Sequence, residues 1–231
     1  MSGKDVSINT VDGAFGGYLA VPGNANGSGM VIIQEIFGVN GFVRAVADAY
    51  AARGYFALAP DLFWRIEPGV QLTDQTKEEW NRAFELMNRF DIDAGIKDIA
   101  AAIQHLRGTE RCAKVGAVGY CLGGLLAYLT AARTDADACV GYYGVNIQEK
   151  LGEAKNIRKP LMLHIAQKDQ FVPPAAQKAI ADGLKTNPLV TIHSYPEMDH
   201  AFARVGGAHY DPANAELANG RTAAFFRQHL S

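Results

Sequence analysis

The chain of 231 residues has few cysteines and no long apolar run. Its three cysteines, Cys112, Cys121 and Cys139, are too few and wrongly spaced for a disulfide framework. No Cys/His cluster has the short ligand spacing of a zinc site, so we expect no metal. No stretch approaches membrane-spanning length, and the N-terminal residues lack the apolar core of a signal peptide. We therefore expect a cytoplasmic protein with no membrane partner and at least one free thiol.

An excess of charge of one sign is also missing. The 22 basic and 24 acidic side chains leave a net charge of −2, and no Lys/Arg cluster stands out. Because binding to a phosphate backbone needs such a cluster, we expect no nucleic-acid partner. An apolar content of 48% is enough to bury one core, so we expect a single domain over residues 1–231. A monomer of this size needs no partner for stability, and we expect a monomer.

Apolar runs alternate with helical patterns along the chain. Residues 6–10 and 14–21 flank the turn dipeptide Asp12-Gly13 and predict an antiparallel hairpin. Later apolar runs, which predict buried strands, cover residues 30–34, 55–59, 114–118, 138–142, 161–166 and 190–195. Segments with helical periodicity lie between most of these runs. This alternation predicts an α/β fold: a mostly parallel, doubly wound sheet with helices on both faces, extended by the N-terminal hairpin.

One connection is longer than a simple crossover requires. Residues 61–90 begin irregularly and then show an amphipathic helical pattern through Trp80, Ala83, Phe84 and Met87. We expect this excursion to overhang the strand ends as part of a binding pocket.

The sequence Gly119-Tyr120-Cys121-Leu122-Gly123-Gly124 follows a predicted strand directly and precedes a helical run. A nucleophile in such a turn is lifted above the sheet by a strained backbone, and small residues two positions on either side avoid a clash. A sulfur at the start of a helix also gains from the positive end of the helix dipole, which favours the thiolate. We interpret Cys121 as a nucleophile. The alternative is a structural cysteine, as we expect for Cys112 and Cys139.

A nucleophile needs a base, and the base needs an orienting acid. Asp169 follows the predicted strand 161–166, and His200 follows the predicted strand 190–195. The order Cys121, Asp169, His200 is that of α/β hydrolases. Taken singly, Asp169 could be a turn or helix cap and His200 an exposed loop residue. Three strand ends that supply these residue types in this order favour a triad.

These segments together resemble the dienelactone hydrolase (carboxymethylenebutenolidase) family. The residues that carry the resemblance are Gln34–Asn40, Gly119–Gly124, Gly141–Gly144, Asp169 with Phe171–Pro173, and His200–Arg204. They occur in family order and span nearly the whole chain. The resemblance implies an α/β-hydrolase fold and a Cys121/His200/Asp169 triad.

Further roles follow from the resemblance alone. It implies an oxyanion hole made by the backbone N–H groups of Leu122 and Ile36. It also implies that Glu35 contacts the resting Cys121 and keeps it poorly reactive until substrate displaces the carboxylate. A buried carboxylate would repel a neighbouring thiolate and could accept its proton. An ion pair with an arginine is the alternative role for Glu35.

The substrate-binding residues match the family less completely. The family holds the substrate carboxylate with arginines, and Arg204 matches one of them. The position of the other is occupied by Trp80, while Arg82 lies two residues further on, roughly 200° round a helix. Arg82 is either a second substrate ligand or a solvated surface arginine. Aromatic residues that suit a flat substrate, or alternatively pack the core, are Phe37, Trp80, Phe84, Tyr143, Phe171 and Phe202.

The sequence therefore predicts a cysteine hydrolase that opens an ester or lactone, with dienelactone as the leading substrate and maleylacetate as its product. It needs no metal or organic cofactor. Two alternatives stay open: a general small-molecule carboxylesterase of the same family, and a noncatalytic protein that binds a ligand or senses oxidants through Cys121.

Overall fold

The computed structural model describes residues 3–231. Its contacts divide the chain into two compact units, the first ending at Ala117 and the second spanning Val118–Ser231. The expectation of one domain over residues 1–231 stays a prediction. Within residues 3–231, no helix combines the length and the hydropathy needed to cross a bilayer.

The first unit is built on the N-terminal hairpin and two parallel strands. Its strands are β1 (Lys4–Thr10), β2 (Gly13–Ala20), β3 (Ser28–Ile33), β4 (Phe56–Pro60) and the first residues of β5 (Lys114–Tyr120). β1 and β4 each pair with β2 in antiparallel fashion, and β3 pairs with β4 in parallel. The predicted hairpin is confirmed, but Thr10 pairs with Gly13, so the turn residues are Val11 and Asp12.

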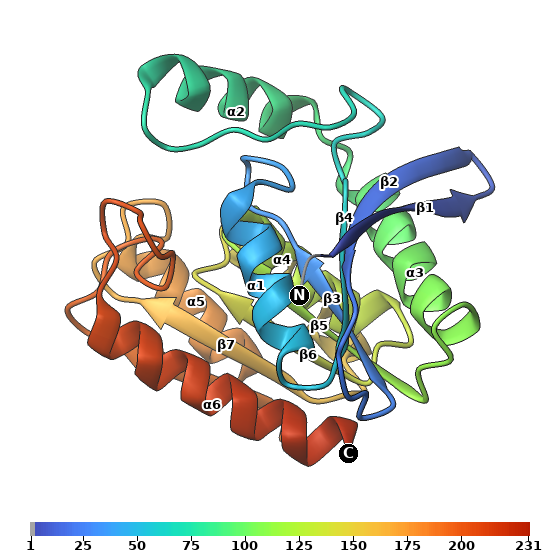
Figure 1. Cartoon of the computed structure of the whole chain (residues 1–231). Helices are drawn as coiled ribbons and strands as arrows, with labels where there is room; N and C mark the ends of the chain where they lie inside the picture. The colour runs from blue at the N-terminus through green and yellow to red at the C-terminus, as the bar shows by residue number, and fades with distance from the viewer. Residues whose placement is uncertain (1–2) are drawn as a thin grey trace. The chain divides into compact units, whose positions relative to one another are not determined.

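Three helices belong to the first unit: α1 (Gly41–Ala51), α2 (Lys77–Arg89) and α3 (Ile92–Gly108). Asn40 caps α1 by accepting a hydrogen bond from the Val43 N–H, and Gly54 beyond its end has a φ of 95°. Helix α2 is the amphipathic segment predicted within residues 61–90, and it buries Ala83 and Leu86. In Figure 1 this helix stands apart from the strands of its own unit.

The second unit follows the alternation that the sequence predicts. It contains the end of β5, then α4 (Leu122–Arg133), β6 (Ala138–Tyr142), a 3₁₀ helix η1 (Ile147–Asn156), β7 (Leu161–Ala166), α5 (Pro174–Leu184), β8 (Val190–Tyr195) and α6 (Pro212–Leu230). Strands β6, β7 and β8 pair in parallel, with His164 beside His193. The bounds predicted for the last three strands are confirmed. The helix η1 was not predicted, because it buries only Ile147 and shows no apolar period.

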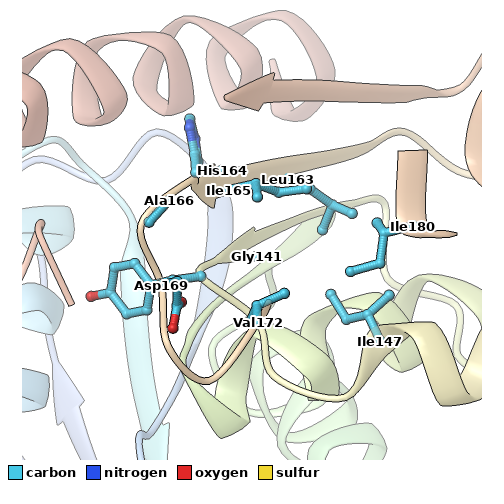
Figure 2. Close-up of a pocket in the computed structure, with 11 residues that line it drawn as sticks. Gly141, Ile147, Leu163, His164, Ile165, Ala166, Asp169, Val172 and Ile180 are labelled. Atoms are coloured by element: carbon cyan, nitrogen blue, oxygen red, sulfur yellow. The ribbon is translucent and has the colours of Figure 1, made fainter. Parts of the chain in front are cut away.

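Side chains of β7 alternate between two covered faces. Figure 2 shows Leu163 on the side of Ile180 in α5 and Ile147 in η1, whereas His164 points to the opposite side. On that side the His164 imidazole contacts Thr222 of α6. Helices therefore cover both faces of the strands in this unit, as the sequence predicts.

A buried chain of hydrogen bonds joins these strands to α6. The His164 Nδ1 atom lies 2.8 Å from the Tyr195 hydroxyl, and its Nε2 atom lies 2.9 Å from the Thr222 hydroxyl. The Thr222 hydroxyl is 2.6 Å from that of Tyr142, which donates to Oδ1 of the Asn219 side chain at 3.0 Å. Every member thereby satisfies its buried polar group.

The groups at the two ends of this hydrogen-bond chain determine which atom is the donor in each of its bonds. Arg221 donates to the Tyr195 hydroxyl at 3.1 Å, so this hydroxyl directs its own proton to His164 Nδ1. The Nε2–H of His164 then donates to Thr222, which donates to Tyr142. Burial, together with the charges of His193 and Arg221, holds the pKa of His164 well below its usual value. The imidazole is therefore neutral and in the Nε2–H form.

Thr222→Val tests the contribution of this chain to stability. The substitution leaves two buried partners, His164 and Tyr142, without the Thr222 hydroxyl, so we expect a loss of about 2–3 kcal/mol in the free energy of unfolding. Thr222→Ser keeps the hydroxyl and removes one methyl group, which costs about 1 kcal/mol. Urea unfolding of both variants measures the difference. Equal losses would show that the chain contributes little.

Candidate active site

Cys121 occupies a strained turn between β5 and α4. Its backbone angles are φ 57° and ψ −115°, a conformation that residues with a side chain rarely adopt. Hydrogen bonds to the last residue of β6 and to the loop that follows it hold the turn: the Cys121 N–H donates to the Tyr142 carbonyl at 3.1 Å, and the Val145 N–H donates to the Cys121 carbonyl at 3.4 Å. The surrounding backbone therefore imposes the strain.

Glycines make this turn possible. A Cβ atom on Gly119 would lie 1.9 Å from the Gly123 carbonyl oxygen, and one on Gly124 would lie 2.6 Å from the Gly144 Cα atom. The need for glycine at 119 follows from the sequence. The packing of Gly124 against Gly144 joins residues twenty positions apart in the chain and emerges only from the fold.

The helix α4 begins directly after Cys121, with Leu122 as its first residue. The first N–H groups of a helix have no acceptor within the helix, and they carry the positive end of the helix dipole. Cys121 is 8% exposed, so its sulfur lies in an environment with little competing water. This position favours negative charge on an oxygen bound beside the sulfur.

His200 and Asp169 form a buried pair. The His200 Nδ1 atom lies 2.7 Å from Asp169 Oδ2, and the other oxygen, Oδ1, accepts a hydrogen bond from the Phe171 N–H at 2.8 Å. Both side chains are buried. Figure 2 shows Asp169 on the loop that follows β7. The carboxylate is thus fixed by its own loop, and it orients the imidazole by accepting the Nδ1–H.

His200 also interacts with Cys121. Burial alone lowers the pKa of His200, but the negative charge of Cys121 and the hydrogen bond to Asp169 outweigh it, with a further hydrogen bond to Cys121, and raise the pKa to about 10. Cys121, His200 and Asp169 therefore lie together in the second unit.

Two aromatic rings flank the imidazole of His200. The ring centroid of Tyr143 lies 5.0 Å away and that of Phe171 lies 4.9 Å away, both edge to face. Phe202 is fully buried and packs against Tyr143 and Tyr195. Phe202 therefore serves the core, whereas Tyr143 and the half-exposed Phe171 form the walls around His200.

Asp199 pairs with His209. Its Oδ2 atom lies 3.0 Å from His209 Nδ1, and its Oδ1 atom accepts the His200 N–H at 2.6 Å. Asp199 therefore ties the backbone of His200 to His209, which lies further along the same connection between β8 and α6. Ala201 completes this tight loop with a φ of 63°. No local pattern in the sequence signals either feature.

The other two cysteines have no comparable setting. Burial raises the pKa of the Cys112 thiol to about 11, with a smaller contribution from the charge of Glu110. Cys139 is completely buried in β6, and burial raises the pKa of its thiol further. Both residues stay neutral thiols at ordinary pH.

Arg204 lies on the loop of His200 and is only 7% exposed. Its N–H donates to the Ala201 carbonyl at 2.9 Å, and Gly207 packs beside its side chain. A Cβ atom at Gly207 would lie 2.8 Å from Arg204 Nε, so a glycine is needed there. The pair Gly206-Gly207 was a sequence signal for this close approach that our sequence analysis did not use.

The remaining predicted site residues lie in the first unit. Glu35, Ile36 and Phe37 follow β3 directly and are buried. The Phe37 ring centroid lies 5.0 Å from that of Trp80, edge to face, and Trp80 also contacts Phe84. These aromatic residues thus form one cluster between the end of β3 and α2.

Arg82 is engaged in ion pairs on the surface of the first unit. Its guanidinium binds the carboxylates of Glu67 and Glu85, and the latter contact measures 2.5 Å. These pairs agree with the reading of Arg82 as a surface arginine.

No group of three or more His, Cys, Asp or Glu side chains in residues 3–231 is arranged to hold a metal ion.

Known proteins similar to this chain cover nearly all of it. It is 54% identical over 231 residues to an Azospirillum brasilense protein provisionally named carboxymethylenebutenolidase, with 98% of this chain and 99% of that protein covered. It is 40% identical to the carboxymethylenebutenolidase of Pseudomonas putida, with 96% and 95% covered.

A crystal structure from Klebsiella pneumoniae subsp. pneumoniae, provisionally described as a dienelactone hydrolase, matches with a TM-score of 0.87 at 25% identity and covers 98% of both chains. The fold is therefore that of the α/β hydrolases, as predicted. The profile of the dienelactone hydrolase family matches residues 15–230. The chain belongs to the dienelactone hydrolase family.

Proposed function

We propose that this protein is a carboxylic ester hydrolase that opens dienelactone to maleylacetate, with Cys121 as its nucleophile. The observation that carries the proposal is the buried constellation of Cys121 on its strained turn, His200 and Asp169. The curated relatives named carboxymethylenebutenolidase, at 54% and 40% identity over nearly the full length, support the substrate.

In the proposed reaction, the Cys121 thiolate attacks the lactone carbonyl carbon and forms a tetrahedral oxyanion. The backbone N–H groups of Leu122 and Ile36 stabilise this oxyanion. As the carbon–oxygen bond of the ring breaks, the His200 imidazolium donates its proton to the leaving oxygen, and a thioester on Cys121 remains. Asp169 holds the imidazole so that its Nε2 atom faces the reacting atoms.

Acylation changes the charge next to His200. While Cys121 is negative, its charge helps to raise the pKa of His200 to about 10, and the imidazolium is ready to act as an acid. A thioester sulfur carries no charge, so the pKa of His200 falls once the acyl enzyme forms. The neutral imidazole can then take a proton from the water that hydrolyses the thioester. One histidine thus serves as acid in the first half of the reaction and as base in the second.

Glu35 provides the proposed control of this cysteine. We propose that its carboxylate competes for the Cys121 proton in the resting enzyme and that bound substrate displaces it. Support comes from the burial of Glu35, which is 1% exposed, because a buried carboxylate gains from sharing a proton.

Steady-state hydrolysis tests the nucleophile and the substrate together. We expect Cys121→Ala and His200→Ala each to reduce kcat/KM for dienelactone by at least about 10³-fold, since each removes a group that acts in the transition state. Cys112→Ala is the matched control and should retain activity, because Cys112 is a neutral buried thiol of the other unit.

The outcomes separate the alternatives. Intact turnover in Cys121→Ala contradicts the mechanism. Comparable wild-type rates on dienelactone and on an uncharged aryl ester indicate a general carboxylesterase. Oxidation of Cys121 without turnover of either ester, in a protein insensitive to His200→Ala, indicates a thiol sensor.

Arg204 is the proposed ligand of the substrate carboxylate. We expect Arg204→Gln to lower kcat/KM for dienelactone roughly 10- to 100-fold, which corresponds to the loss of one charged hydrogen-bonded contact. The same variant should hydrolyse an uncharged aryl ester at close to the wild-type rate. Arg82→Gln is the control: Arg82 is already paired with Glu67 and Glu85, so its loss should change neither rate more than about 2-fold. A larger effect in Arg82→Gln than in Arg204→Gln contradicts this assignment.

Glu35→Gln tests the restraint on Cys121. Without the competing carboxylate, more of Cys121 should exist as the thiolate beside the His200 imidazolium, and iodoacetamide should alkylate it several-fold faster. In this variant an NMR titration should find His200 protonated up to a pH of about 10, and alkylation of Cys121 should then lower that pKa. Glu67→Gln, a change of an exposed carboxylate, is the control. Equal alkylation rates in wild type and Glu35→Gln would contradict the proposed restraint of Cys121 by Glu35.

A further inference from the structure

A groove of about 440 Å³ lies between the strands β7 and β8 and the helix α6, all within the second unit. Its apolar wall comes from Met162, Leu189 and Phe225, and its polar side carries Arg221, His193 and His229. No residue of the triad lines it. The strand register places Met162 beside Thr191 and His164 beside His193, so this is the face of the strands that α6 covers. In Figure 1, α6 runs along β7.

Arg221 has no carboxylate partner within the described part of the chain. Its guanidinium donates one hydrogen bond, from Nη1 to the Tyr195 hydroxyl at 3.1 Å, and its Cζ atom lies 5.5 Å from the centre of the Tyr195 ring. A guanidinium has several N–H donors in a rigid planar fork. Most of the donors of Arg221 are therefore left for another acceptor.

Buried hydrogen-bonded groups fix the position of Arg221. The Tyr195 hydroxyl that receives its hydrogen bond also donates to His164 Nδ1, 2.8 Å away, and His164 is bound in turn to Thr222. Tyr195 and His164 are buried, so neither ring can move without breaking the chain. An arginine that is held in place in advance loses little conformational entropy when it binds an anion.

His193 adds a second polar group beside Arg221. Its ring stacks on that of His164 with centroids 5.7 Å apart. Burial and the charge of Arg221 lower the pKa of His193, so the imidazole is neutral at pH 7 and can donate one N–H. A carboxylate has two oxygens, and these two donors lie on one side of a groove whose other wall is apolar.

We propose that this groove binds a small amphipathic carboxylate, with the carboxylate on Arg221 and His193 and the apolar body against Met162, Leu189 and Phe225. The site is separate from the triad and does not depend on the proposed function. The ligand's carboxylate would pair with Arg221, which has no carboxylate partner in the described part of the protein. Binding therefore requires the negative charge of the ligand and not its apolar body alone.

An NMR titration with sodium benzoate tests the site, with benzyl alcohol as the uncharged control. We expect saturable shifts of the His193 ring and Arg221 Nε signals with benzoate, at a Kd on the order of 1 mM, and no saturable shift with benzyl alcohol. Arg221→Gln should weaken benzoate binding, followed at His193, about 10-fold or more. Absence of a saturable shift at His193, or equal binding of both compounds, overturns the proposal.

Ala224 supplies a variant pair that leaves Arg221 and its hydrogen bond in place. This exposed residue lines the groove one helical turn after Arg221. Ala224→Glu puts a carboxylate within reach of the guanidinium and should abolish benzoate binding, whereas Ala224→Gln, of the same size, should retain it within about 3-fold. Dienelactone or aryl ester turnover should be unchanged in both. Equal benzoate affinity in the two variants contradicts the assignment of Arg221.

Discussion

The strained backbone at Cys121 is the constraint on which the proposed chemistry depends. A residue with φ 57° and ψ −115° stays in that conformation only when its surroundings leave it no alternative. Two close glycine contacts, at Gly119 and between Gly124 and Gly144, allow the turn, and hydrogen bonds to the last residue of β6 and to the loop after it hold the turn. With the turn fixed, the sulfur sits at the start of α4 and within reach of His200.

The pKa of an ionisable group in this site depends on the charges of its neighbours. The pKa of His200 depends on the charge of Cys121 and on Asp169, against the opposing effect of burial. A change in the bonding of the sulfur therefore changes the proton affinity of the imidazole. The same low-dielectric surroundings have the opposite outcome at His164, where the interactions with His193 and Arg221 also lower the pKa, and that imidazole stays neutral. The pKa values of two buried histidines of one unit are thus shifted in opposite directions.

The hydrogen-bond chain through His164 links the core of the second unit to its surface. It begins at Arg221 in the groove beside α6 and ends at Asn219. Tyr195, one of its members, also packs on Phe202, which contacts the Tyr143 ring beside His200. The hydrogen-bond chain therefore supports the aromatic wall beside His200 as well as the guanidinium in the groove.

The sequence by itself determined the elements and the order of the candidate triad. The strands 161–166 and 190–195 were predicted with their observed bounds. The first is a fully buried, largely apolar run, as is typical of a central parallel strand, whereas the second buries only Tyr195. Local sequence also marked Cys121, through glycines that a tight turn requires. Only the tertiary structure decided the contact of Gly124 with Gly144, the pairing of Asp199 with His209 and the chain through His164. Each of these joins residues ten or more positions apart, and no local pattern specifies which partner a residue meets at such a separation.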